Sequence, residues 1–370
     1  MRRRDFLLRL SSTVPTAVTI SAGLRSAWAE ELPVTDGWRT FELTMSADIA
    51  NPSGRTCLWL PLAMGRRTDY QRTLDTKWTA PSASRAEVVR IPGYDVELLR
   101  VEWSDFKAVG PVTLINRVAT RDRRVDVSAP PSAAVRRESA RALQNFLRPT
   151  ALLPTGGLVK TTADRITRDR HGNIEKARAI YEWVVENTNR DPQTRGCGLG
   201  DVGSMLESGN LGGKCADINA LFVALARAVQ IPARDAYGLR VADSQRGFKS
   251  LGKSGDVSKA QHCRAEFYAQ GYGWVPVDPA DVRKVVLEEV PGGLPMSDPK
   301  VQTARSSLFG SWEMNWVAYN HGHDIALPGS DQRAIPFLMY PNGETSEGRL
   351  DSLDPSTFRY EIHSRELKNA

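Results

Sequence analysis

Short runs of alternating apolar and polar residues fill the chain between residues 38 and 127. A period of two is typical of strands that bury one face, and turn signals such as Asn-Pro-Ser-Gly at 51–54 separate the runs. The predicted strands cover residues 38–45, 56–60, 86–91, 96–103 and 111–119. This pattern predicts an all-β sandwich domain, which we place at residues 30–130.

Beyond the Pro-Pro pair at 130–131 the pattern changes to a helical period, which predicts a domain boundary. Residues 133–147 and 173–186 carry apolar side chains at three- and four-residue steps. The most apolar stripe lies in GGKCADINALFVALARAVQIPAR, residues 212–234, where a proline ends it. This stripe predicts a buried helix with Cys215 in its first turn.

A strand, a turn and a second strand follow at residues 262–268 and 274–277, joined by Gln-Gly-Tyr-Gly. With the turn centred near residue 271, antiparallel pairing makes His262 face a position between 278 and 281. We therefore expect His262 and Asp278 to lie close together at the open end of this hairpin.

Further strands are predicted at 236–241, 337–340 and 357–363. The glycine-rich polar segment 188–210 reads as a loop that leads to Cys215. Loops of this length inside a domain are usually functional or mobile, so we expect it to line or gate a site.

Composition and charge narrow the class of protein. The 370 residues are 41% hydrophobic and 25% charged, as in ordinary soluble globular proteins. The formal net charge is +6, but five arginines and one aspartate in residues 1–29 contribute +4 of it. The remainder is nearly balanced, so the charge gives no indication of nucleic-acid binding.

Residues 1–29 have the pattern of an export signal. Arg-Arg-Asp-Phe-Leu at 3–7 precedes an uncharged stretch, residues 10–24, and Ala-Trp-Ala at 27–29 matches a cleavage site. The arrangement resembles a twin-arginine signal peptide, so the expected partner during secretion is the twin-arginine export machinery. The mature protein is expected in the periplasm or otherwise secreted, with an uncleaved membrane anchor as the alternative.

The four cysteines are Cys57, Cys197, Cys215 and Cys263, and none forms a CxxC pair, which excludes thioredoxin-like and zinc-finger motifs. A thiol at a helix start is favoured as the thiolate, because free backbone N–H groups and the helix dipole stabilise negative charge there. If Cys215 stays unpaired for this reason, an oxidising compartment permits at most one disulfide, among the other three.

Cys215, His262 and Asp278 are the candidate catalytic residues. They supply a nucleophile, a general base and an orienting carboxylate, which thiol-based acyl transfer requires. The backbone N–H of Cys215 is the expected oxyanion donor. Each residue alone also fits a structural role, as a buried thiol, a hydrogen-bonded core histidine or a turn-forming aspartate.

These residues and their flanking motifs resemble the transglutaminase-like superfamily, whose core is papain-like. The resemblance rests on Gly-Gly-Lys-Cys at 212–215, Gln-Ile-Pro-Ala-Arg at 230–234, the strand led by His262, and Trp-Val-Pro-Val-Asp-Pro at 274–279. It covers roughly residues 160–285 and places the family's Cys, His and Asp on the three candidate catalytic residues.

The resemblance implies an α+β fold in which a helix carrying the cysteine packs on an antiparallel sheet. We place this catalytic domain at residues 131–290 and a C-terminal extension, packing on the core, at 291–370. The family also implies a side-chain oxyanion donor, for which Gln193 and Trp183 are candidates.

No cofactor or metal is expected. The family's calcium-activated members carry acidic sites in extra regions that have no visible counterpart here. His-Gly-His-Asp at 321–324 offers three potential metal ligands, but a short loop without a fourth anchored ligand is a poor metal site.

The leading hypothesis is an exported cysteine enzyme that acts on amide bonds through a thioester, with protease- or amidase-type hydrolysis favoured over transglutamination. The alternative is a non-catalytic peptide- or protein-binding module on the same scaffold. A third hypothesis is redox control by reversible bonding of Cys215 to Cys197 or Cys263, with Cys197 favoured because strand alternation turns Cys263 away from the face of His262. Peptide stems of the cell wall, exported proteins and small peptides are all compatible substrates, and the sequence leaves the oligomeric state open.

Overall fold

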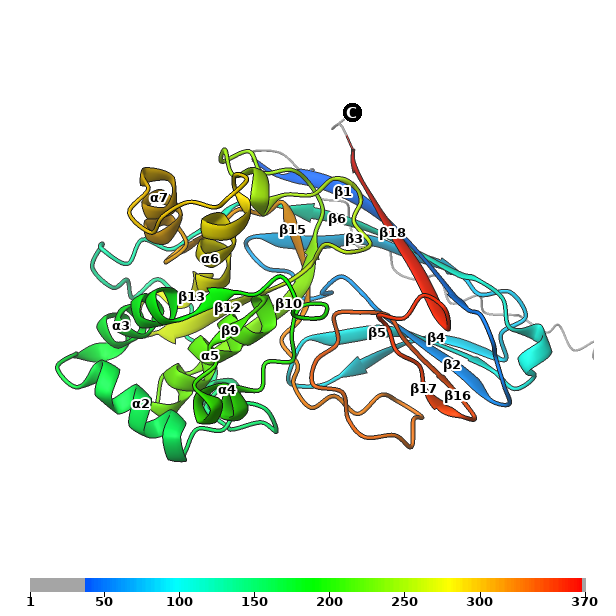
Figure 1. The fold of residues 1–370 in the computed structure, drawn as a ribbon. Coiled ribbons are helices and arrows are strands. Elements are labelled where there is room, and N and C mark those ends of the chain that lie inside the picture. Colours follow the sequence, from blue (N-terminus) through cyan, green and yellow to red (C-terminus); the bar gives the residue numbers. More distant parts are fainter. Residues whose placement is uncertain (1–36, 368–370) are drawn as a thin grey trace, which may run out of the picture. The chain divides into compact units, whose positions relative to one another are not determined.

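Two five-stranded antiparallel sheets pack against each other in the computed structural model, which describes residues 37–367 (Figure 1). The first sheet has the order β11 (Gly255–Asp256), β18 (Phe358–Leu367), β1 (Arg39–Ile49), β6 (Val112–Thr120), β3 (Gln71–Thr79). The second has the order β17 (Gly348–Arg349), β16 (Asn342–Thr345), β2 (Thr56–Pro61), β5 (Val96–Trp103), β4 (Arg85–Ile91). Apolar side chains of both sheets, such as Leu43 and Leu60, share one buried core, which makes the pair a β-sandwich. The predicted signal peptide, residues 1–29, lies outside the described residues.

The alternating pattern predicts five of the sandwich strands within a few residues of their observed ends. In β1 the burial of side chains alternates along most of the strand, because one face packs into the core. Strand β3 was not predicted. It lies at the edge of its sheet and most of its side chains are partly or fully exposed, so its sequence lacks an apolar alternation.

The last part of the chain completes the sandwich. Strand β18 pairs with β1 along ten residue pairs, from Thr40 opposite Leu367 to Ile49 opposite Phe358. Strands β16 and β17 extend the second sheet beside β2. The segment 291–370, which we expected as an extension packing on the core, thus supplies three strands to the sandwich. The segment expected as the catalytic domain, residues 131–290, therefore lies between strands of this sandwich in sequence.

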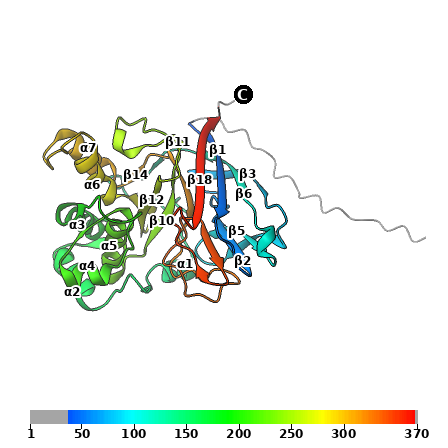
Figure 2. The same cartoon turned by 45° about the vertical axis from the view of Figure 1, so that its right-hand side comes forward.

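A four-stranded antiparallel sheet forms the centre of the other half, in the order β13 (Gly273–Val277), β12 (Gln261–Ala269), β10 (Ala233–Arg240), β15 (Trp316–Asn320). Helix α5 (Cys215–Ala228) packs on β12 and β10. Helices α2 (Gly157–Thr167), α3 (Gly172–Asn187) and α6 (Pro279–Glu288) surround α5 (Figures 1 and 2). Every residue of α5 is buried, and Cys215 is its first residue. The expected α+β fold with a buried helix that carries the cysteine is confirmed.

The remaining elements are short: α1 (Ala140–Asn145), α4 (Val202–Ser208), α7 (Pro299–Ser307), β7 (Arg123–Arg124), β8 (Asn189–Arg190), β9 (Gly212–Gly213) and β14 (Ser311–Trp312). The predicted helix at 133–147 is reduced to α1. The segment 188–210 is more ordered than expected, because it contains β8 and α4. Within residues 37–367, no helix is both long and apolar enough to cross a membrane.

The hairpin of β12 and β13 has the predicted geometry. Its register runs from Ala265 opposite Val277 to Ala269 opposite Gly273. Continued beyond Val277, this register puts the partner of His262 within the predicted window. The chain instead turns into α6 after Val277, so Asp278 approaches His262 from the start of a helix.

Candidate active site

The start of helix α5 presents the Cys215 thiol and leaves one backbone donor unoccupied. The N–H of Ala216 donates to the Cys197 carbonyl at 2.9 Å, and the N–H of Lys214 donates to Asp217 Oδ2 at 2.9 Å. Within the described residues, no hydrogen bond involves the N–H of Cys215 itself. This donor is therefore available at the positive end of the helix, where a developing oxyanion is stabilised.

The Asp217 carboxylate fixes the loop that faces the thiol. Its Oδ1 accepts hydrogen bonds from the N–H groups of Leu199, at 3.0 Å, and Gly200, at 2.9 Å. Because Asp217 sits in the first turn of α5, the helix start and the loop 196–200 form one unit. This link could not be predicted from the sequence, since an aspartate three residues after a helix cap also fits simple capping.

His262 is held by the carboxylate of Asp278. Nε2 of His262 lies 2.8 Å from Oδ2 of Asp278, and both side chains are buried. The other carboxylate oxygen, Oδ1, accepts the N–H of Asp281 at 3.0 Å and so caps α6, whose first residue is Pro279. The helix-capping role and the imidazole-orienting role are thus filled by the same side chain.

Asn219 joins the helix of the cysteine to the other two residues. It lies four residues after Cys215 on α5, so the two side chains share one face of the helix. Its Nδ2 donates to the Cys263 carbonyl at 2.9 Å and lies 3.3 Å from Asp278 Oδ1. The sequence analysis missed Asn219, which the helical spacing from Cys215 could have indicated.

Two arginines and a second aspartate surround the imidazole. Oδ1 of Asp281 lies 3.3 Å from His262 Nε2 and pairs with Arg240, and Arg264 lies 3.6 Å from Asp278 Oδ2. His262, Asp278 and Asp281 could together present ligand atoms to a metal ion. The two guanidinium groups already balance both carboxylates, so a divalent cation would meet repulsion there. The residues therefore do not fit a metal centre.

Burial and the positive charge of Arg240 lower the pKa of His262, but the carboxylates of Asp281 and Asp278 outweigh them, and the net pKa lies above the usual 6.5. Burial raises the pKa of Asp281, yet Arg240, His262 and Arg264 hold it far below its usual value. Burial, followed by the charge of Asp281, raises the pKa of Asp278. The cluster as a whole favours a protonated imidazole.

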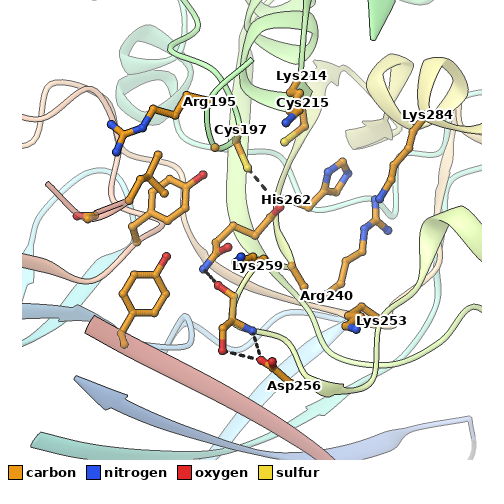
Figure 3. A pocket seen from close by; sticks show the side chains of 18 of the residues that line it. Arg195, Cys197, Lys214, Cys215, Arg240, Lys253, Asp256, Lys259, His262 and Lys284 are labelled. Carbon is orange, nitrogen blue, oxygen red and sulfur yellow. Dashed lines mark hydrogen bonds between the residues drawn. The ribbon is translucent and has the colours of Figure 1, made fainter. Parts of the chain in front are cut away.

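Cys215 and His262 both line a pocket of about 740 Å³ (Figure 3). No hydrogen bond joins the Cys215 thiol to His262 in the described part of the chain, and none involves His262 Nδ1. A looser contact of this kind is common in active sites without substrate. Tyr340, Phe358 and Tyr360 also line the pocket, so the C-terminal segment contributes to it.

Three thiols gather beside this pocket. The Cys197 Sγ donates to the Gln261 carbonyl at 3.3 Å and lines the pocket with Cys215. The neighbouring thiols of Cys215 and Cys263 lower the pKa of Cys197, and burial followed by the thiols of Cys197 and Cys215 raises the pKa of Cys263. All four cysteines are unbridged. Strand alternation turns Cys263 away from His262, but the face it turns to packs against α5, which carries Cys215. Alternation therefore does not separate Cys263 from Cys215.

Other sequence-predicted groups lie elsewhere. Trp183 packs on the hydrophobic core from α3 and Gln193 is exposed, and neither lines the pocket, so neither is placed as the side-chain oxyanion donor. His321 lies beside Asp95 and Glu266, whereas His323 lies 3.0 Å from Asp235. The two histidines have separate partners and do not converge on one metal position.

Comparison with known proteins places this geometry in a family. The sequence model of the transglutaminase-like superfamily matches residues 160–279. An uncharacterised protein of Haemophilus influenzae is 35% identical over 346 residues, which cover 88% of this chain and 91% of that protein. This chain belongs to the transglutaminase-like superfamily.

A solved structure resembles this chain over both of its halves. A crystal structure of a candidate cysteine protease from Cytophaga hutchinsonii aligns with a TM-score of 0.55 over 90% of this chain and 92% of that one. The two sequences are 15% identical, so this likeness concerns the fold alone. The sandwich and the α+β core of this superfamily member are thus arranged as in a solved structure.

Replacing Asp278 with Asn should lower the pKa of His262, because it removes a negative charge 2.8 Å from Nε2. The folded protein raises the pKa of His262, so protonation of His262 stabilises the fold. This stabilisation is fully present below pH ~6.5, the ordinary pKa of histidine, and is lost as the pH rises through the folded-state pKa. NMR titration of the His262 resonances checks the shift, with Asp331→Asn, in an exposed loop outside the pocket, as the control. An unchanged His262 pKa in Asp278→Asn would contradict the assigned pair.

Replacing Asn219 with Leu should destabilise the fold by about 1–3 kcal/mol, because the buried Cys263 carbonyl loses the hydrogen bond from Asn219. The same change should slow alkylation of Cys215, because Asp278 also loses a partner. Asn173→Leu is a matched control, because Asn173 also donates to a β12 carbonyl, that of Tyr268, at 3.0 Å, but from α3 and far along the strand from His262. Denaturant unfolding and iodoacetamide kinetics measure the two effects. Equal slowing in both variants would show that Asn219 acts only through stability.

Proposed function

We propose that this protein is an exported cysteine enzyme that hydrolyses amide bonds through Cys215, His262 and Asp278. The observation that carries the proposal is the buried hydrogen bond that fixes His262 against Asp278 at the edge of the pocket that Cys215 lines. A structural histidine or a buried structural thiol needs no such shared pocket. Membership of the transglutaminase-like superfamily supports an enzymatic role.

The mechanism follows from the placement of these groups. The Cys215 thiolate attacks the carbonyl carbon of the amide, and the oxyanion forms beside the Cys215 N–H. His262, protonated and held by Asp278, gives its proton to the leaving nitrogen as the C–N bond breaks, which leaves a thioester. Water, deprotonated by His262, then attacks the thioester, releases the carboxylic acid and restores the thiol.

Electrostatics favour water over an amine as the acceptor. Seven basic side chains line the pocket, of which three arginines pair with carboxylates, and the four lysines outnumber the one lining carboxylate, that of Asp256. A lysine acceptor carries a positive charge at neutral pH, so it would be repelled from this pocket, whereas water is not. Hydrolysis is therefore the reaction we propose, and transamidation is the second outcome to be measured.

Export is part of the proposal and rests on the twin-arginine-like leader. Fractionation of cells that express the full chain tests it. We expect mature protein in the periplasmic fraction with an N-terminus after Ala29, as the cleavage pattern predicts. A full-length chain confined to the cytoplasm would contradict it.

Iodoacetamide labelling at neutral pH tests the catalytic thiol without a known substrate. Cys215 should react much faster than a free thiol with a pKa near ~8.5, because the imidazolium stabilises its thiolate. Labelling of each cysteine is followed by mass spectrometry, with His262→Gln expected to remove the excess rate. Slow and equal labelling of all four cysteines would favour the non-catalytic binding module instead.

Peptide and cell-wall libraries test the reaction itself, with a fluorescent primary amine present to report transamidation. Cys215→Ala should lose at least about a thousandfold in rate, since triad residues act as a unit. Cys57→Ala, a cysteine buried in the sandwich, is the matched control and should keep the activity. Amine incorporation faster than hydrolysis would contradict the hydrolytic assignment.

A further inference from the structure

We propose that the pocket selects an acidic peptide, in which a carboxylate follows the scissile amide on the leaving-group side. The inference rests on the proposed function and adds the substrate class. It starts from the charge of the pocket, which is not explained by the Cys215, His262 and Asp278 chemistry.

Part of the positive charge is neutralised within the protein. Arg240 pairs with Asp281, Arg190 with Glu288, and Arg195 with Asp351. These three arginines therefore leave little net charge in the pocket.

Four lysines supply the excess. Lys214, Lys253 and Lys259 line the pocket and have no ion pair within the described residues. Lys284 reaches only Glu288, at 3.6 Å, and Glu288 is already paired with Arg190. The one lining carboxylate, Asp256, accepts two hydrogen bonds from Ser258. A partly enclosed pocket focuses such a field and concentrates anions.

Lys284 marks the place for the substrate carboxylate. It lies three residues after Asp281 on α6, so the same helix face carries both side chains. In Figure 3 its amine and the Arg240 guanidinium approach each other beside His262. Burial and the charge of Arg240 lower the pKa of Lys284, and a substrate carboxylate beside the amine would raise it again.

The reaction fixes the side of the substrate that meets Lys284. His262 protonates the leaving nitrogen, so the part of the peptide beyond that nitrogen lies next to His262. Lys284 flanks His262, and a carboxylate just after the scissile amide therefore reaches it. Lys253 and Lys259, both exposed at the outer part of the pocket, are placed to meet further acidic groups.

Paired alkylating probes test the charge of the site without a substrate. Iodoacetate carries a carboxylate and iodoacetamide does not, and both alkylate thiolates. At low ionic strength, the iodoacetate-to-iodoacetamide rate ratio at Cys215 should exceed that of a small neutral thiol by about tenfold or more, and it should fall with added salt. A ratio equal to that of the model thiol, without salt dependence, would overturn the inference.

Lysine variants show which lysine raises the iodoacetate-to-iodoacetamide rate ratio at Cys215. Lys284→Met keeps the aliphatic stem and removes the charge, so the rate ratio should fall severalfold. Lys77→Met, on the exposed edge strand β3, is the control and should leave the ratio unchanged. Mass spectrometry assigns each rate to Cys215 rather than to Cys197. Equal ratios in Lys284→Met and wild type would refute the role of Lys284.

Matched peptides identify the anion. Three peptides carry glutamate, glutamine or phosphoserine directly after the cleaved amide, and kcat/KM is measured for wild type and Lys284→Met. A preference for glutamate that Lys284→Met removes supports the proposal. A preference for phosphoserine over glutamate, or no preference over glutamine, contradicts it. If no peptide is cleaved, the proposed hydrolysis is at fault, and the probe ratio still decides the charge of the pocket.

Discussion

The buried carboxylate of Asp278 is the constraint on which the site depends. A carboxylate removed from water must have its oxygens hydrogen-bonded or paired with charge, since an unsatisfied buried charge is strongly unfavourable. Its partners are the imidazole of His262, the N–H of Asp281 and the amide of Asn219. These partners come from β12, α6 and α5, so satisfying one side chain fixes three elements relative to one another. His262 is therefore positioned by the same interactions that hold these three elements together.

Charge balance around this carboxylate explains why so many ionic groups are buried here. Two carboxylates and two guanidinium groups surround the imidazole in one cluster, so their four charges cancel and the protonated imidazole adds one positive charge. Loss of one member leaves the others uncompensated, so the cluster acts as a unit. This arrangement stabilises the form of His262 that can donate a proton, and it does so in a region from which bulk water is excluded.

Much of the site could be predicted from the sequence because its signals are local. Periodicity located α5 and the β12–β13 hairpin, and the flanking motifs indicated the family. Asp281, Arg240 and Arg264 could not be found in this way, because their roles depend on contacts between elements distant in sequence. The return of the C-terminal strands to the sandwich was missed for the same reason, since strand pairing across the whole chain leaves no local pattern. The edge strand β3 was missed because it buries too little to show alternation.

The placement of β18 has a consequence for how the protein matures. Phe358 and Tyr360 belong to the strand that pairs with β1, and both line the pocket that Cys215 and His262 share. A nascent chain can contain Cys215, His262 and Asp278 well before these two side chains are synthesised. The pocket acquires this part of its lining only when β18 pairs with β1, the earliest strand of the sandwich. Assembly of the cavity is thus tied to the pairing of two strands that lie far apart in the sequence.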